Sequence, residues 1–322
     1  IDNSTISYST INNSSVCDST FDNATVYNST VCYEGVTFEI IDEIIIDQIM
    51  TEQTDPTVSS VAITSAAGIQ NSRLNAGDNV SVTATFSESV IVDNASGTPT
   101  LTIVVGSTNR TATYASGSGS SALVFKYTIQ SGETDTNGIS IGADSLALNS
   151  STIRDASGNY ATITHSLVNN NSSYIVDTTA PTVSSVAITW STSSTDESQY
   201  KLPADSGDLC DGSVVGSECY IHVTATFSEN VTVTGTPQLA IVVGSTDRTA
   251  FYNAAASGST ALVFRYAIRN DDPLDTDGIL IGADTISLNS GTITDLAGND
   301  ATITHSTIGA GVENDDYQVK DW

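Results

Sequence analysis

The residues of this chain best suited to bind a ligand are oxygen donors in short turns. Aspartate and asparagine stand beside glycine in DTNG, DTDG, RDASGN and TDLAGN. Calcium takes six to eight oxygens from carboxylates and carbonyls, so such turns suit it. The alternative is that Asp, Asn and Gly serve only as turn formers; no EF-hand loop occurs. The candidate calcium ligands are Asp135, Asn137, Asp155, Asn159, Asp275, Asp277, Asp295 and Asn299.

The histidines give no sign of catalysis. His165 and His305 occupy the same place in two copies of ATITHS, and His222 is the third histidine. Duplication with a whole domain is typical of a structural strand residue. The chain has no G-x-S-x-G, H-E-x-x-H or P-loop motif. We therefore expect that the protein is not an enzyme.

The charge of the chain limits its partners. It has 9 Lys and Arg against 37 Asp and Glu, which gives a net charge of −28. A polyanion repels nucleic acids and anionic membrane surfaces, so we expect neither as a partner. No apolar run is long enough to span a bilayer. Charged residues make up only 14% of the chain, so Ser, Thr, Asn and Gly must cover most of the surface.

The elements that position these residues are predicted to be strands. VTATFSE, LTIVVG, ALVFKYTI and ALVFRYAI are regular apolar runs rich in β-branched residues, which are typical of strands. Long helical periodicity is absent, and glycines stand between the runs. The sequence therefore predicts an all-β chain and argues against disorder.

Most of the chain consists of two copies of one sequence. PTVSSVAIT begins at Pro56 and again at Pro181, and Gly97–Tyr114 matches Gly235–Tyr252. Several short strands separated by turns predict a β-sandwich for each copy. The short linker VDTTAP favours a stiff connection. We expect a segment at 1–52, a first sandwich at 53–177 and a second at 178–322.

Four motifs in a fixed order carry a resemblance to a known family. The TAP-V-S-V opening, the F-S-E-x-V strand, the G-T-P-x-L strand and the D-x-A-G-N turn resemble bacterial Ig-like repeat domains over roughly residues 53–322. Those repeats occur in large surface adhesins and extracellular structural proteins. The resemblance implies tandem Ig-like sandwiches that serve as a scaffold or adhesive module outside the cell.

The second copy carries an insert between Trp190 and Ile221 that contains Cys210 and Cys219. Two cysteines that flank a Gly/Ser-rich loop indicate a disulfide that closes the loop. A metal site is the weaker interpretation because no second Cys/His pair is nearby. The disulfide implies an oxidising, extracellular setting.

Covalent N-glycans are also expected if the source organism makes them, because N-x-S/T triplets in polar, turn-rich surface are acceptors. The candidate positions are Asn3, Asn12, Asn13, Asn23, Asn28, Asn79, Asn94, Asn109, Asn149, Asn170, Asn171 and Asn230.

The first residues repeat every five positions. An apolar residue leads each block from Ile1 to Val31, and a small residue stands two places before nearly every leader. This pattern resembles the pentapeptide-repeat family, whose chains wind into a square β-helix with four blocks per turn. The resemblance implies a short β-helix-like coil. Glu34 and Glu39 would point inward, which is costly for a charge, so we expect the regular coil to end between Val31 and Val36.

Two features after this repeat leave alternatives open. Cys17 and Cys32 lie three blocks apart, which places them on different sides of a square coil. A bond between them would favour a three-sided or trimeric winding, and a bond to a neighbouring subunit is the third option. The apolar segment Glu39–Met50 is either the last rung of the coil or a strand that pairs with a neighbouring molecule.

These patterns lead to three functional expectations. The first is a structural subunit of an extracellular filament, sheath or surface layer that assembles with copies of itself, head to tail, through its N-terminal segment. The second is the stalk of a large cell-surface adhesin, and the third is a carbohydrate-binding accessory module. The chain begins at Ile1, so we expect a processed mature form or a fragment of a longer protein.

Overall fold

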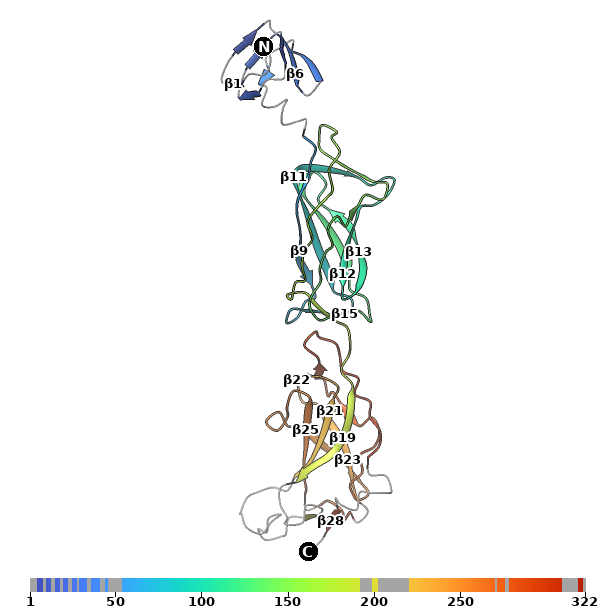
Figure 1. The fold of residues 1–322 in the computed structure, drawn as a ribbon. Helices are drawn as coiled ribbons and strands as arrows, with labels where there is room; N and C mark the ends of the chain where they lie inside the picture. Colours follow the sequence, from blue (N-terminus) through green and yellow to red (C-terminus); the bar gives the residue numbers. More distant parts are fainter. Residues whose placement is uncertain are drawn as a thin grey trace. The chain divides into compact units, whose positions relative to one another are not determined.

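The computed structural model describes backbone and side chains for residues 54–189, 220–269, 271–275 and 278–308. It also describes the backbone alone of the strands between residues 5 and 45, of residues 190–191, and of the strands at 199–201 and 318–320. Every regular element among these residues is a β-strand. The prediction of an all-β fold is confirmed (Figure 1).

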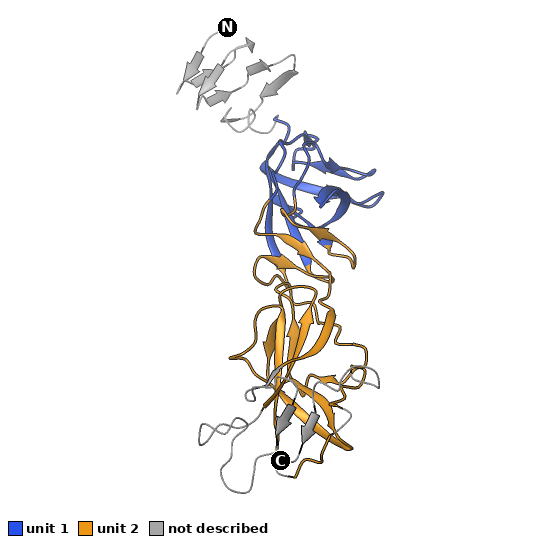
Figure 2. Ribbon diagram, turned by 60° about the horizontal axis from the view of Figure 1, so that its bottom comes forward, with its two compact units in different colours: residues 1–66, 79–127, 140–170 blue, residues 67–78, 128–139, 171–322 orange. Residues whose placement is uncertain are grey.

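Contacts between elements divide the chain into two compact units (Figure 2). Unit 1 comprises Ile1–Ala66, Asn79–Tyr127 and Ser140–Asn170, and unit 2 comprises Ala67–Asp78, Thr128–Ile139 and Asn171–Trp322. Unit 2 thus joins one end of the first sequence copy to the second copy. The expected domains at 1–52, 53–177 and 178–322 follow the sequence repeat and stay a prediction.

Unit 1 contains a seven-stranded antiparallel sheet. Its strands follow the order β16-β12-β13-β14-β11-β17, with β9 paired to β11. The strand bounds are β9 (Val58–Ala67), β11 (Asn79–Asp93), β12 (Thr100–Val105), β13 (Thr108–Ser116), β14 (Ser120–Thr128), β16 (Leu146–Ala147) and β17 (Thr152–Arg154).

Side-chain alternation explains why these segments are strands. On β11, Val80, Val82, Ala84 and Phe86 are almost fully buried, while the residues between them are partly exposed. Successive side chains of a strand point to opposite faces, so one face of β11 lies in the core. The predicted strand VTATFSE lies in β11, and LTIVVG and ALVFKYTI lie in β12 and β14 except for the last residue of each.

A two-residue turn fixes the register of β12 against β13. Val105 pairs with Thr108, and Gly106 between them has φ 61°. A glycine with positive φ at the first turn position matches the twist of the flanking strands. The second copy repeats this turn at Gly244, which has φ 57°. The motif VVGST therefore encodes the same hairpin in both copies.

Unit 2 contains a three-stranded sheet of order β10-β18-β15 and a six-stranded antiparallel sheet of order β19-β21-β25-β24-β23-β26. The bounds are β10 (Arg73–Leu74), β15 (Thr134–Asp135), β18 (Ile175–Asp177), β19 (Val183–Ser191), β21 (Tyr220–Phe227), β23 (Gln238–Val243), β24 (Thr246–Tyr252), β25 (Ala261–Ala267) and β26 (Ile286–Ser287). Two further pairs are β20 (Gln199–Lys201) with β28 (Gln318–Lys320), and β22 (Thr232–Thr234) with β27 (Thr292–Thr294).

The core of unit 2 comes from the inner face of its six-stranded sheet. Val223 and Ala225 on β21, Leu239 and Ile241 on β23, and Phe264 on β25 belong to one buried cluster. The predicted strand ALVFRYAI lies in β25 and the residue that follows it. Ile279 from a loop and Ile293 from β27 complete the cluster, which gives a sandwich-like packing.

The five-residue repeat forms short strands that pair in parallel. The three pairs are β1 (Thr5–Ser7) with β4 (Thr20–Asp22), β2 (Thr10–Asn12) with β5 (Thr25–Tyr27), and β3 (Ser15–Cys17) with β6 (Ser29–Tyr33). Thr5 pairs with Thr20, so one turn spans 20 − 5 = 15 residues. The coil therefore has three blocks per turn, and the expected square winding with four is wrong.

Antiparallel strands follow the coil. β7 (Val36–Ile40) pairs antiparallel with β6, and β8 (Ile44–Ile45) pairs antiparallel with β5. The parallel winding ends with β6 at Tyr33, which confirms the expected end between Val31 and Val36. Part of the apolar segment Glu39–Met50 thus pairs with strands of the same chain.

Candidate functional site

The predicted calcium turns are closed by hydrogen bonds from their own backbone. The Oδ1 atom of Asp135 accepts the N–H of Asn137 and of Gly138, and the Oδ1 atom of Asp275 accepts the N–H of Gly278. Both aspartates are buried. These carboxylates cap turns, which is the alternative that the sequence left open.

The two D-x-A-G-N turns repeat this arrangement. Asp155 accepts the N–H of Gly158 and the N–H and Nδ2–H of Asn159. Burial opposes ionisation of Asp155, but the hydrogen bonds from Asn159 and Gly158 outweigh it and lower the pKa of this carboxyl. Asp295 is held in the same way by Asn299. Asp277 lies outside the described residues.

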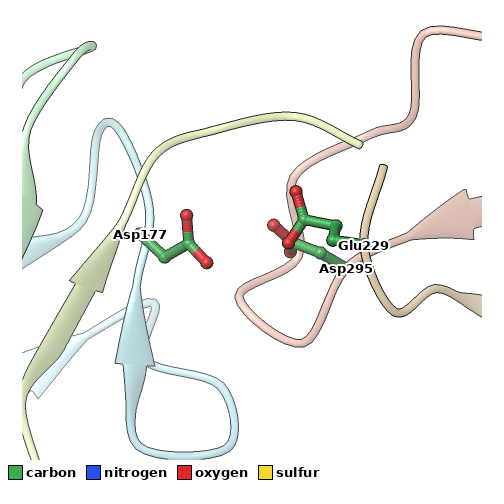
Figure 3. A group of neighbouring side chains, drawn as sticks. All are labelled: Asp177, Glu229 and Asp295. Atoms are coloured by element: carbon green, nitrogen blue, oxygen red, sulfur yellow. The ribbon is translucent and has the colours of Figure 1, made fainter. Parts of the chain in front are cut away.

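One of these aspartates belongs to a cluster of three carboxylates within unit 2 (Figure 3). Asp177 ends β18, Glu229 follows β21 and Asp295 follows β27. One carboxylate oxygen from each residue lies within 4.8 Å of the others. Asp295 is buried, whereas Asp177 and Glu229 are half-buried. The cluster brings Asp177, at the end of the first sequence copy, close to residues that follow two strands of the second copy.

Ionisation of Glu229 is disfavoured in this cluster. Burial, followed by the charges of Asp177 and Asp295, raises the pKa of Glu229 above its usual value. Asp295 accepts hydrogen bonds from the N–H of Ala297 and from the N–H and Nδ2 of Asn299. A proton on Glu229 or a cation between the carboxylates would relieve the repulsion.

The oxygens of this cluster are of the type that calcium prefers, but three carboxylates supply only part of its coordination. Of the predicted calcium ligands, Asp295 alone is in the cluster, and Asp177 and Glu229 were not predicted. Asp177 lies in the VDTTAP linker and Glu229 in an F-S-E-x-V strand motif, and neither pattern is typical of a metal ligand. Calcium stays a prediction for these loops.

Hydrogen bonds tie the two sequence copies together beside this cluster. The Nδ2 atom of Asn299 donates to the carbonyl oxygen of Asp177 at 2.8 Å. The Nδ2 atom of Asn71 donates to the carbonyl oxygen of Leu296 at 3.0 Å. Thr178 donates to the carbonyl oxygen of Glu133 and accepts the N–H of Gly132. The short linker is therefore fixed by contacts on both sides.

The duplicated histidines make equivalent hydrogen bonds. Nε2 of His165 accepts the backbone N–H of Ser145 at 2.9 Å, and Nε2 of His305 accepts that of Thr285 at 3.0 Å. The backbone N–H groups of both histidines donate to an aspartate twenty-one residues earlier in the chain, Asp144 or Asp284. These bonds brace the same loop in each copy, which supports a structural role.

The glycosylation candidates differ in how available their amides are. Asn94, Asn109, Asn149, Asn170 and Asn230 are exposed, and Asn79 and Asn171 are half-buried. The Nδ2 atom of Asn149 donates to the carbonyl of Thr98 and to the hydroxyl of Thr100, so its amide is engaged. The side chains of Asn3, Asn12, Asn13, Asn23 and Asn28 lie outside the described residues.

Cys210 and Cys219 also lie outside the described residues, so their disulfide stays a prediction. Cys17 and Cys32 occupy in-register positions of β3 and β6. Within the part of the chain that the structure describes, no helix is long and apolar enough to cross a membrane.

Comparisons with family models, with curated proteins and with solved structures found no match to this chain. The resemblances to Ig-like repeats and to pentapeptide repeats therefore stay expectations.

Proposed function

We propose that this protein is a structural subunit of an extracellular filament, sheath or surface layer, and that its copies join head to tail through the N-terminal coil. The observation that carries the proposal is the pairing of the first coil turn. Among the described strands, β1, β2 and β3 each pair on one side only. Unpaired strand edges are templates for a further strand, and a head-to-tail contact that does not close gives a filament.

The junction between the two sequence copies supports the same role. A filament subunit must transmit force along its length, and a flexible linker between the two copies would not transmit it. The bonds of Asn299 to Asp177 and of Asn71 to Leu296 favour a stiff connection. Exposed Asn94, Asn109 and Asn230 are suitable attachment points for glycans on such a surface.

A pair of lysine substitutions tests the proposal. Thr10→Lys places a charge on the edge strand β2, where lysine discourages strand pairing between molecules. Thr111→Lys is the matched control on β13, where Thr111 is exposed and the strand is already paired on both sides. We expect the wild type and the control to sediment as polymer and Thr10→Lys to stay in the supernatant.

Sedimentation of Thr10→Lys as polymer, with its circular dichroism unchanged, would contradict the proposed interface. The alternative function is the stalk of a larger cell-surface adhesin. A stalk holds a separate binding domain away from the cell and needs no self-association, so monomers at every concentration would favour it. Neither role requires catalysis, and we propose no enzymatic activity.

A further inference from the structure

A groove in unit 2 gathers aromatic and cationic side chains. It has a volume of about 510 Å³ and lies at the start of β21 and the ends of β24 and β25. Tyr220, Phe251 and Tyr252 line it together with Arg265 and Arg269. Phe251 is 49% exposed, which is unusual for a phenylalanine on a folded surface.

Comparison of the two sequence copies shows that part of this groove is specific to the second copy. Alignment of β11 with β21, of β13 with β24 and of ALVFKYTIQ with ALVFRYAIR gives the counterparts in the first copy. Tyr252 and Arg265 have like counterparts, Tyr114 and Lys126, but at four other positions an uncharged polar residue stands where the second copy has an aromatic or cationic one. The pairs are Asn79 and Tyr220, Ser81 and His222, Thr113 and Phe251, and Gln130 and Arg269.

Ring contacts hold the groove in shape. The guanidinium of Arg265 lies over the ring of Tyr220, 4.0 Å from its centroid. Tyr220 also stacks on His222, with ring centroids 6.3 Å apart and an interplanar angle of 29°. Arg269 lies 5.9 Å from the ring centroid of Tyr266. Such contacts order long arginine side chains before a ligand arrives.

The local charge balance favours an anion. Asp272 is the buried acid beside Tyr266, and Arg248 pairs with it at 2.5 Å. Arg265 and Arg269 thus line the groove beside an acid that has its own cationic partner. Only 9 of the 322 residues are Lys or Arg. Two of them line this groove, and together with Arg248 they outnumber the two acids that pair with Arg248, Asp271 and Asp272, on a chain that otherwise repels anions.

We propose that this groove binds an acidic saccharide. One sugar ring stacks on the exposed face of Phe251, and Arg265 and Arg269 hold the carboxylate of the saccharide. Aromatic rings bind the apolar faces of sugars as they bind other apolar surfaces, and guanidinium groups are well suited to carboxylates. The proposal is independent of filament assembly, since none of these residues lies in the coil.

Calorimetric titration of the full chain tests the proposal, with oligogalacturonate as the acidic probe and maltohexaose as a neutral probe. The triple variant Tyr220→Asn/Phe251→Thr/Arg269→Gln installs residues that the first copy carries at these positions. Lys126→Gln is the matched control, because Lys126 is the first-copy counterpart of Arg265. Thermal melting of each variant reports whether it folds.

We expect saturable binding of oligogalacturonate that added salt weakens, and much weaker binding of maltohexaose. The triple variant should lose about tenfold or more in affinity, which corresponds to about 1.4 kcal/mol, while Lys126→Gln binds as the wild type does. The single variant Phe251→Thr should show part of this loss and serves if the triple variant does not fold.

Three results would overturn the proposal. They are the absence of saturable oligogalacturonate binding, equal affinity for maltohexaose, and unchanged affinity in folded Phe251→Thr and triple variants. Equal affinity for the neutral probe would identify a neutral-sugar groove instead. None of these results bears on sedimentation of the wild type, so the filament proposal is tested separately.

Discussion

The carboxyl group of Glu229 lies in an environment that disfavours its ionisation. Its pKa is raised in the folded chain by burial and by Asp177 and Asp295. For an acid, a raised folded pKa means that the ionised group destabilises the native state at neutral pH. This cost disappears as the pH falls through the raised pKa, because the native state then binds the proton more readily than the unfolded state does.

Glu229→Gln should therefore stabilise the protein at neutral pH. We expect a rise in Tm of about 1–3 °C, since partly exposed charges contribute little. The gain should shrink as the pH is lowered, because the wild-type carboxyl is then neutral. Differential scanning calorimetry at several pH values measures the difference in Tm between the variant and the wild type. A lower Tm of the variant at neutral pH would contradict the prediction.

A calcium ion bound between the three carboxylates would relieve the same repulsion. Millimolar CaCl₂ should raise the Tm of the wild type more than that of Glu229→Gln, which has lost one carboxylate. MgCl₂ at the same concentration is the control, because Mg²⁺ requires shorter ligand distances and a nearly ideal octahedral geometry. An identical response of both proteins to calcium would exclude this cluster as the calcium site.

Asp272, in contrast to Glu229, is a buried acid with hydrogen-bond partners and a cationic partner. It accepts hydrogen bonds from Tyr266 and from the backbone N–H of Arg269, and it pairs with Arg248. The hydrogen bond from Arg248 to Asp272 raises the pKa of Arg248, although burial of Arg248 opposes this shift. Burial, followed by the hydrogen bond to Asp272, also raises the pKa of Tyr266.

Removal of this acid should destabilise the second sandwich strongly. Asp272→Ala leaves Arg248 and Tyr266 without their buried partner, and we expect a loss of about 3 kcal/mol in the free energy of unfolding. Asp271→Ala is the matched control, because Asp271 lies 3.7 Å from Arg248 but is 73% exposed. Urea denaturation measures both variants. A similar loss in each would contradict the account of a buried network.

The strands of the sandwiches could be predicted from sequence because burial alternates along them. Val80, Val82 and Ala84 face the core at every second position of β11. The winding of the N-terminal coil could not be predicted from sequence, because a five-residue period is compatible with any number of blocks per turn. Backbone pairing decides it, with Ser15 opposite Thr30. The spacing of Cys17 and Cys32 was the one hint of three blocks.

The three-sided winding makes a chemical prediction for that cysteine pair. Cys17 and Cys32 are in register on neighbouring parallel strands. Neighbouring strands lie about 4.8 Å apart, and a disulfide needs Cα atoms about 4.4–6.8 Å apart. We expect these cysteines to bond to each other when the protein matures with an external disulfide as oxidant, which accepts the two electrons and two protons of the thiols.

Mass spectrometry of peptides from the unreduced protein tests the bond. The expected product joins the peptides that contain Cys17 and Cys32. The double variant Cys210→Ser/Cys219→Ser is the control and should leave that bond in place. Free thiols at both positions, or a bond from either to Cys210, Cys219 or another subunit, would contradict a three-sided winding.

At the scale of the whole molecule, two copies of one sequence share most of their strands but differ in the side chains that these strands carry. The hairpin at Gly106 recurs at Gly244, whereas the ring of Phe251 replaces the hydroxyl of Thr113. The carboxylate cluster was missed from sequence for a related reason. Asp177 and Glu229 meet only where the end of one copy contacts the loops of the next, and no strand pattern encodes that contact.

The central claim is that copies of this chain join into a polymer through the first turn of the coil. Electron microscopy of the purified full chain at high concentration tests it most directly. The account predicts regular filaments whose axial repeat matches the length of one chain, and their loss in Thr10→Lys. Monodisperse single molecules of the wild type at every concentration would contradict it.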